Sequence, residues 1–240
     1  ATIAGVMFQQ VVPHHVTGEF TSHRKFLPDD QYGVALDCLV KACSDLLLVS
    51  PDGSQIFLGK RNVHPQPDWW FVGGRIFPGE TAVQSCCRLL KRELSLDIEP
   101  IRFETVCCQS LAWGMRQQMP QEHGTTDAQV VLSLRLQEAE VEKVVLDPKE
   151  YSASQWICPT DVLAGSFHPA LKFAVASLQA ARKMRQLQAA VRAHPSNDAE
   201  VAMLARQFVE LSAVVPPAGY SDYRVVTPEL NYECSVQTIL

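Results

Sequence analysis

The sequence predicts an α/β fold in which β-strands surround a central helix, with a helical C-terminal extension after them. Two observations support this prediction. Before residue 158, short runs of β-branched and aliphatic residues lie between turn residues, as is typical of strands. The segment 81–94 interrupts these runs with the spacing of an amphipathic helix, and from Pro169 onward the composition becomes typical of helices.

The first strands flank a turn at Pro51-Asp52-Gly53, which predicts a hairpin. The helix at 81–94 follows from apolar residues spaced three or four apart, namely Val83, Cys86, Cys87, Leu90 and Leu94. Strands are predicted, in chain order, at residues 34–41, 45–50, 56–60, 69–72, 103–110, 129–136 and 151–157.

The sequence of the C-terminal part predicts two helices. The first spans 170–192 with Pro169 in its first turn, and Asn197 or Asp198 can cap the second. The tail from 216 to 240 shows no sustained period, so it either wraps on a surface or extends freely. We therefore expect a first domain, with an N-terminal extension, over residues 1–183 and a helical extension with a tail over residues 184–240.

Composition excludes several classes of protein. Hydrophobic residues make up 47% and charged residues 20%, which allows a buried core and argues against disorder throughout. The net charge of −5 argues against a general nucleic-acid binder or a membrane-surface binder, because both need a basic face. The apolar runs are too short to span a bilayer, and no secretory signal is visible at the start.

The cysteine pattern indicates thiols rather than a metal site. None of the eight cysteines forms a Cys-x-x-Cys pair or a Cys/His cluster at zinc spacing, so we expect no zinc site. Free cysteine behaves as a small hydrophobe, and buried thiols are typical of the cytoplasm or another reducing compartment.

A glycine-rich segment carries the clearest chemical signal. Gly73 and Gly74 open a loop that reaches Glu80 and then feeds directly into the predicted helix, which carries Glu93. Glycines allow close approach of a phosphate, and a helix N-terminus favours anions. A hard cation such as Mg²⁺ prefers one or two carboxylates plus phosphate oxygens. The segment therefore suits a pyrophosphate substrate with a divalent cation.

This segment resembles the Nudix box, a loop-helix-loop metal site. Leu89, Arg92 and Ser95 depart from the motif, because they stand where it has two glutamates and a glycine. The positions on pattern are Gly74, Glu80, Arg88, Leu90, Glu93 and Leu96. The resemblance implies a Nudix fold, an α/β/α sandwich around a mixed β-sheet, here with a helical C-terminal extension.

The chain is most similar to the GDP-mannose mannosyl hydrolase group of Nudix proteins, over about residues 30–180. That group also has fewer glutamates in its box, although it usually has a proline before the two glycines, where this chain has Val72. Similar segments, in order, are the run containing Asp37, Leu58-Gly59-Lys60-Arg61, Trp70-Phe71-Val72, Gly73-Gly74-Arg75, Gly124-Thr125-Thr126-Asp127 and Leu163 to Phe173, which includes His168.

The resemblance implies a Mg²⁺-dependent hydrolase of a nucleotide sugar such as GDP-mannose. Water would attack the anomeric carbon of the sugar, and nucleoside diphosphate would leave. Glu93, Glu80 and a backbone carbonyl near Gly74 would hold Mg²⁺, with Mn²⁺ as a substitute. Trp70 and Asp127 are the expected contacts to the substrate.

Catalytic roles follow from the same resemblance. Arg61 and Arg75 would stabilise the charge that grows on the leaving diphosphate. His168 would deprotonate the water, since an imidazole can act as a base at neutral pH. Asp37 would orient the sugar or the diphosphate, and an unpaired carboxylate on a predicted apolar strand would itself be costly without a partner. The loop 114–124 is a candidate lid, and His123 a candidate for the catalytic tyrosine that the group has there.

Two other functions stay open. If Arg92 pairs with Glu93, it occupies the metal position and the fold serves as a non-catalytic binding or scaffold subunit of a larger assembly. Alternatively, the chain is a Nudix pyrophosphohydrolase that attacks phosphorus. The group works as homodimers, so a homodimer is expected, and the C-terminal extension is a candidate docking arm for another protein.

Overall fold

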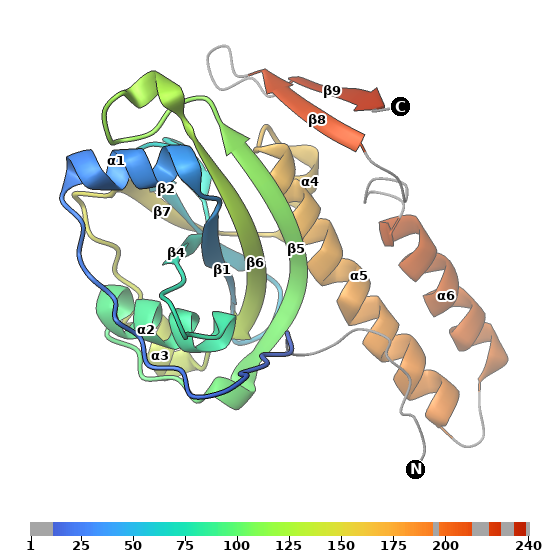
Figure 1. Ribbon diagram of the computed structural model, residues 1–240. Coiled ribbons are helices and arrows are strands. Elements are labelled where there is room, and N and C mark those ends of the chain that lie inside the picture. The colour runs from blue at the N-terminus through green and yellow to red at the C-terminus, as the bar shows by residue number, and fades with distance from the viewer. Residues whose placement is uncertain (1–11, 194–196, 213–220, 227–232, 239–240) are drawn as a thin grey trace. The chain divides into compact units, whose positions relative to one another are not determined.

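The first part of the chain is built around a seven-stranded mixed β-sheet (Figure 1). The computed structural model describes residues 12–193, 197–212, 221–226 and 233–238. The strand order of the sheet is β3-β2-β1-β6-β5, while β4 pairs with β1 and β7 pairs with β2. The strands are β1 (Lys41–Val49), β2 (Ile56–Arg61), β3 (Trp69–Trp70), β4 (Val72–Arg75), β5 (Phe103–Trp113), β6 (Thr125–Arg135) and β7 (Tyr151–Ile157).

The sheet is mixed because β1 pairs in parallel with β6 and antiparallel with β2 and β4. The parallel register runs from Lys41 opposite Asp127 to Val49 opposite Arg135. The long strands β5 and β6 lie side by side as an antiparallel pair (Figure 1). The predicted hairpin between β1 and β2 is confirmed, and Gly53 in its turn has a φ of 83°.

Helix α2 (Ala82–Leu94) covers one face of this sheet. Thr81 caps it: its side chain accepts a hydrogen bond from Gln84 N–H, while the Gln84 side chain accepts one from Thr81 N–H. The apolar face of α2 packs against the face of β1 and β6 that is turned toward this helix, and together they form the main hydrophobic core. The buried residues of this core include Leu46, Leu48, Val83, Cys86, Leu90, Leu94, Leu132 and Leu134.

The expectation for residues 34–41 is wrong. Most of this segment belongs to helix α1 (Asp29–Cys38), and the strand begins only at Lys41. Apolar residues at 34 and 36 suggest a strand, but only Gly33 and Leu36 are buried in the helix, a spacing of three. Asp29 and Asp30 occupy its first turn, where acidic side chains favour the helix dipole.

The other elements of this part agree with the sequence, with modest shifts at their ends. The segment predicted as one strand at 69–72 divides between β3 and the start of β4, which pair with different neighbours, β2 and β1. Three short helices were not anticipated: η1 (Pro100–Arg102), η2 (Gln121–His123) and α3 (Glu138–Val141).

The chain divides into two compact units, Ala1–Ile157 and Cys158–Leu240. In the second unit, α5 (Pro169–Arg192) packs against α6 (Asp198–Ser212), which confirms both predicted helices, and the short α4 (Pro159–Ala164) precedes them. Within the tail, β8 (Ser221–Val226) and β9 (Glu233–Thr238) form an antiparallel pair that the sequence did not suggest. The predicted boundary at 183 stays a prediction. None of the described helices combines the length and apolarity that a membrane span needs.

Candidate functional site

The two glycines of β4 lie against different partners. At Gly73 a β-carbon would stand 1.8 Å from Asp45 Oδ1, so only glycine fits beneath this carboxylate. At Gly74 a β-carbon would stand 3.3 Å from Leu89 of α2. The glycine pair therefore allows close packing on both sides of β4, against β1 on one side and against α2 on the other.

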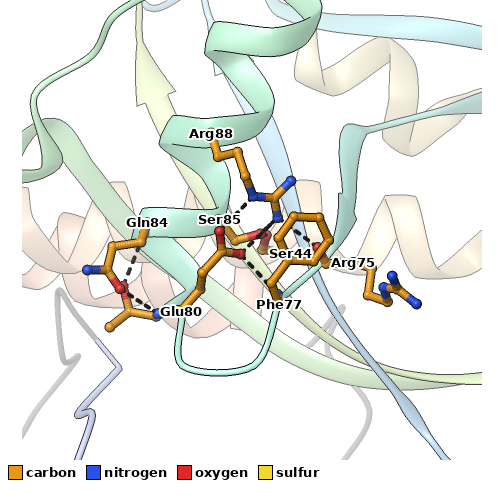
Figure 2. Close-up of polar contacts among 8 residues, drawn as sticks. Ser44, Arg75, Phe77, Glu80, Gln84, Ser85 and Arg88 are labelled. Atoms are coloured by element: carbon orange, nitrogen blue, oxygen red, sulfur yellow. Dashed lines mark hydrogen bonds and ion pairs between the residues drawn. The ribbon is translucent and has the colours of Figure 1, made fainter. Parts of the chain in front are cut away.

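An ion pair locks the loop between β4 and α2 (Figure 2). Arg88 Nε donates to Glu80 Oε1 at 2.7 Å, and its Nη2 donates to Glu80 Oε2 and to the Arg75 carbonyl, both at 2.9 Å. Phe77 N–H also donates to Glu80 Oε2 at 2.9 Å. Burial raises the pKa of Glu80, but these hydrogen bonds outweigh it and hold the pKa below its usual value. Both Glu80 oxygens are thus engaged, and a metal at Glu80 would have to displace Arg88.

Glu93 lies at the last turn of α2 with its side chain 13% exposed. Burial raises its pKa, although the adjacent ion pair with Arg92 opposes the shift. Its Oε2 atom is buried and accepts no hydrogen bond. One turn earlier on the same helix face, the apolar Leu89 approaches Gly74. Glu93 is therefore the carboxylate of this helix that has a buried oxygen available for a cation.

Arg61 ends strand β2 close to Glu93. Its Nε is buried and donates no hydrogen bond, and Tyr151 lies opposite it in the register of β2 and β7. Burial raises the pKa of both Glu93 and Asp45, and the charge of Arg61 opposes this rise, so its guanidinium lies near both carboxylates. An arginine N–H and a carboxylate oxygen that are both buried, without a hydrogen-bond partner and near one another, are groups that a bound polar ligand could satisfy.

Asp45 is a residue that the sequence reasoning missed. It lies on β1 with 6% exposure, and burial raises its pKa to about 7. Gln129 of β6 donates to Asp45 Oδ2, and Gln109 of β5 donates to Gln129 Oε1, so a polar row crosses three strands. The signal was present, because Asp45 directly precedes four apolar residues, 46–49, that form the last part of a strand.

Asp37 lies on α1 rather than on a strand, as a consequence of the corrected secondary structure. Arg116, whose side chain is 1% exposed, donates to Asp37 Oδ1 at 2.5 Å. His123 Nδ1 lies 3.2 Å from Asp37 Oδ2. The hydrogen bond from Arg116, followed by that with His123, lowers the pKa of Asp37. The carboxylate that we expected on the sugar is thus paired with protein groups.

Arg116 also organises the loop 114–124. It donates to the carbonyls of Gln118 at 3.1 Å and Gly124 at 3.2 Å. At Gly33 of α1, a β-carbon would stand 2.8 Å from the Met119 carbonyl. The loop expected to act as a lid is therefore tied to α1 by a buried arginine and a close backbone contact.

An open pocket of about 670 Å³ lies beside this loop. Asp37, His123 and Trp113 are among the residues that line it. The remaining lining residues are Leu36, Cys38, Leu39, Val40, Ala112, Thr125 and Thr126. An aromatic side chain, aliphatic walls and a few polar groups are the usual lining of a small-molecule pocket.

Asp127 lies next to the pocket, but its carboxylate is engaged. Lys41 Nζ lies 3.0 Å from Asp127 Oδ1, and Trp113 Nε1 donates to Oδ2 at 2.9 Å. Burial lowers the pKa of Lys41, but Asp127 outweighs this and the net pKa is raised. Trp70, the other expected substrate contact, is buried edge-on against Phe71 and Trp113 with centroids 4.8 and 5.5 Å apart. Trp70 thus contributes to the core, and a contact with substrate stays a prediction.

His168 belongs to the second unit and caps α5. Its Nδ1 accepts a hydrogen bond from Ala170 N–H at 3.1 Å. Burial lowers its pKa to about 4, so the imidazole is neutral at physiological pH. A neutral imidazole can accept a proton.

The described residues include no group of three or more His, Cys, Asp or Glu side chains arranged to hold a metal ion. Glu93, with its buried orphan oxygen, fits one position of a magnesium site that substrate phosphates and water complete. The predicted site residues therefore fall into three groups in the first unit: Glu93 with Arg61, Glu80 with the loop before α2, and Asp37 with the pocket.

Comparison with known proteins gives a family match. The model of the NUDIX domain family matches residues 43–178. No curated protein matches the sequence. Many solved structures are similar. The C. elegans Ap4A hydrolase is 15% identical, with a TM-score of 0.40 over 59% of this chain and 98% of that one.

Two further similar structures are bacterial. A MutT NUDIX hydrolase from Burkholderia pseudomallei is 19% identical, with a TM-score of 0.45 over 58% of this chain and 98% of that one. The E. coli dihydroneopterin triphosphate pyrophosphohydrolase is 19% identical, with a TM-score of 0.38 over 52% of this chain and 87% of that one.

Proposed function

The chain belongs to the NUDIX domain family, and from this membership we propose that it hydrolyses a nucleotide sugar such as GDP-mannose with the help of Mg²⁺. The products are nucleoside diphosphate and free sugar. One observation carries the proposal: the buried, unpartnered Oε2 of Glu93 lies near the buried, unpartnered Nε of Arg61. A cation on the first and a diphosphate oxygen on the second would satisfy both atoms.

Glu93 and a backbone carbonyl near Gly74 would hold the Mg²⁺, while Glu80 keeps the loop in place through Arg88. The bound ion would neutralise charge on the diphosphate and make it a better leaving group. Arg61 and Arg75 would add positive charge at the same leaving group. A site with one carboxylate oxygen that no protein group engages suits charge neutralisation better than the activation of a water by several ions.

The pocket beside loop 114–124 is the proposed sugar site. Its wall residue Val40 lies two residues before Ala42, whose carbonyl accepts from Ile76 N–H at 2.9 Å. The loop that follows Gly74 and Arg75 therefore starts at the end of the sheet that carries the pocket. A diphosphate at that loop would leave the sugar within reach of Trp113, whose face suits the apolar side of a sugar ring.

His168 is the proposed base. The water oxygen would form a bond to the anomeric carbon, the bond from that carbon to the diphosphate oxygen would break, and one water proton would pass to the imidazole of His168. Because its pKa is about 4, the base is ready above about pH 5, and kcat/KM should not fall between about pH 8 and pH 5 through this group.

Product analysis in ¹⁸O-labelled water tests the proposal. GDP-, UDP- and ADP-sugars are incubated with the full chain and Mg²⁺ and followed by phosphorus and proton NMR. Attack at carbon puts the label in the free sugar and leaves an unlabelled nucleoside diphosphate. Label in nucleoside monophosphate or sugar phosphate would instead show attack on phosphorus and refute the proposed chemistry.

Three substitutions then test the residues against a matched control. Glu93→Gln and Arg61→Gln should each lower kcat/KM by about 10²-fold or more, because each removes charge from the leaving-group site. His168→Asn should lower kcat by about 10²-fold. Lys91→Gln, an exposed change on the same helix, should leave the rate unchanged. A His168→Asn protein with full activity would exclude that residue as the base.

A second candidate function is a non-catalytic binding or scaffold subunit, and the ion pair of Arg92 with Glu93 favours it. The Arg92 side chain is 59% exposed, and such pairs are worth at most about 1 kcal/mol, so a cation could displace it. Absence of turnover for every nucleotide sugar, with retained binding of a nucleoside diphosphate, would favour this candidate.

We also propose a homodimer and a docking role for the C-terminal extension. Light scattering after size-exclusion chromatography measures the molar mass of the protein in solution and so tests for the homodimer. Deletion of residues 216–240 tests the second, because unchanged activity with lost association would support docking and unchanged association would refute it.

A further inference from the structure

Three arginines gather around the ring of Phe77, in the loop between β4 and α2. The guanidinium carbon of Arg24 lies 3.3 Å from the ring centroid and that of Arg88 lies 3.6 Å from it. They must stack on opposite faces, because two guanidinium groups at these distances on one face would overlap. The guanidinium of Arg75 lies 5.7 Å from the same centroid and 4.9 Å from the ring of Tyr32.

The positive charge of this cluster is only partly balanced. Glu80 is the carboxylate that contacts it, and Arg88 engages both of its oxygens. In the part of the chain that the structure describes, no ion pair joins Arg24 or Arg75 to a carboxylate. Figure 2 shows the Arg75 side chain pointing away from the pair of Glu80 and Arg88. The charge of Arg24 also contributes to the lowered pKa of Glu80, so three guanidinium groups share this one carboxylate, and a further anion beside them would reduce their mutual repulsion.

Arg24 reaches the ring because the N-terminal segment is seated on the loop at a second point. Phe20 lies against Gly79, where a β-carbon would stand 2.6 Å from Phe20 Cε1. Gly79 has a φ of 88°, which favours glycine and turns the loop toward this segment. Arg24 lies in a stretch without helix or strand, so its position depends on these two side-chain contacts.

We propose that Arg24 and Arg75, held on the ring of Phe77, form a binding site for a phosphate or pyrophosphate anion beside the glycine loop. The planar fork of a guanidinium group matches phosphate oxygens, and stacking on an aromatic ring fixes its plane in advance. The anion has two possible sources, the diphosphate of the substrate or free pyrophosphate. In the first case the inference rests on the proposed function and adds the N-terminal segment to the substrate site.

Calorimetric titration of the full chain with sodium pyrophosphate, without divalent metal and at low salt, tests the site directly. Arg24→Gln and Arg75→Gln should each weaken binding about tenfold. Phe20→Ala should weaken it less, because it loosens the segment but keeps the charge. The control Lys91→Gln removes an exposed cation elsewhere and should bind like the parent protein. Circular dichroism and thermal unfolding verify that each variant is folded.

Absence of pyrophosphate binding in the parent protein, or binding by Arg24→Gln within twofold of the parent, would overturn the proposal. If Arg24→Gln also raises KM for a nucleotide sugar with little change in kcat, the anion is the substrate diphosphate. If it weakens pyrophosphate binding and leaves KM unchanged, the site takes free anion. Binding that depends on Arg24 in a protein without turnover would support the site and refute the proposed hydrolase.

Discussion

Replacing Asp45 by Asn should raise the free energy of unfolding, relative to that of the parent protein, by more at alkaline pH than at acidic pH. The structure buries this carboxylate under Gly73 and raises its pKa to about 7, from 3.8 in the unfolded chain. A raised carboxyl pKa means that the folded protein binds the proton more tightly. Between these two values the folded state keeps a proton that the unfolded state has lost, so the free energy of unfolding falls as pH rises.

The size of the effect follows from the two pKa values. Each unit between them corresponds to about 1.4 kcal/mol, so the complete loss is about 4 kcal/mol at alkaline pH, and about 2.5 kcal/mol of it develops between about pH 5 and pH 8. Asn has the shape of Asp, can still accept the hydrogen bond from Gln129, and does not ionise. The difference in the free energy of unfolding between the variant and the parent should therefore shift by about 2.5 kcal/mol in favour of the variant from about pH 5 to about pH 8.

Urea unfolding at both pH values, followed by circular dichroism, measures this difference. Glu122→Gln, which removes an exposed carboxylate, is the control and should show no such dependence. A difference between Asp45→Asn and the parent that is the same at both pH values would refute the reasoning, because it would mean that Asp45 is ionised throughout this range in the folded protein.

Gly73→Ala should destabilise the fold by about 3 kcal/mol or prevent folding, because its β-carbon would overlap a buried carboxylate, while Gly114→Ala, with no atom within 4 Å of the new β-carbon, should be neutral in the same denaturant titration. Arg116→Met should lower the free energy of unfolding by about 1–3 kcal/mol, since it leaves the buried Gly124 carbonyl without its donor, and a midpoint of thermal unfolding equal to that of the parent would contradict this role. Arg92→Gln should strengthen binding of Mn²⁺ by several-fold in a calorimetric titration, because it frees Glu93 from its ion pair; unchanged affinity would show that Glu93 is not a metal ligand.

Local patterns of the sequence were sufficient for most elements. The bounds of β7 agree with the predicted 151–157, and α2 and α5 agree within one residue, since an alternating or helical period is a property of neighbouring residues. Residues 34–41 were misread because apolar residues two apart suit both a strand and one side of a helix. Burial of Gly33 and Leu36 settles the choice, and burial is a tertiary property.

The sequence by itself determined the family and the loop before α2, because these depend on residue types at fixed spacings along the chain. Only the tertiary structure decided how the charges are paired. Asp37 contacts Arg116, 79 positions away, and Arg24 contacts Phe77, which is also distant from it in the sequence. The pKa of Asp45 depends on β4 and β6 covering it. Such contacts join segments distant in sequence, and their electrostatics depend on burial, which no local pattern specifies.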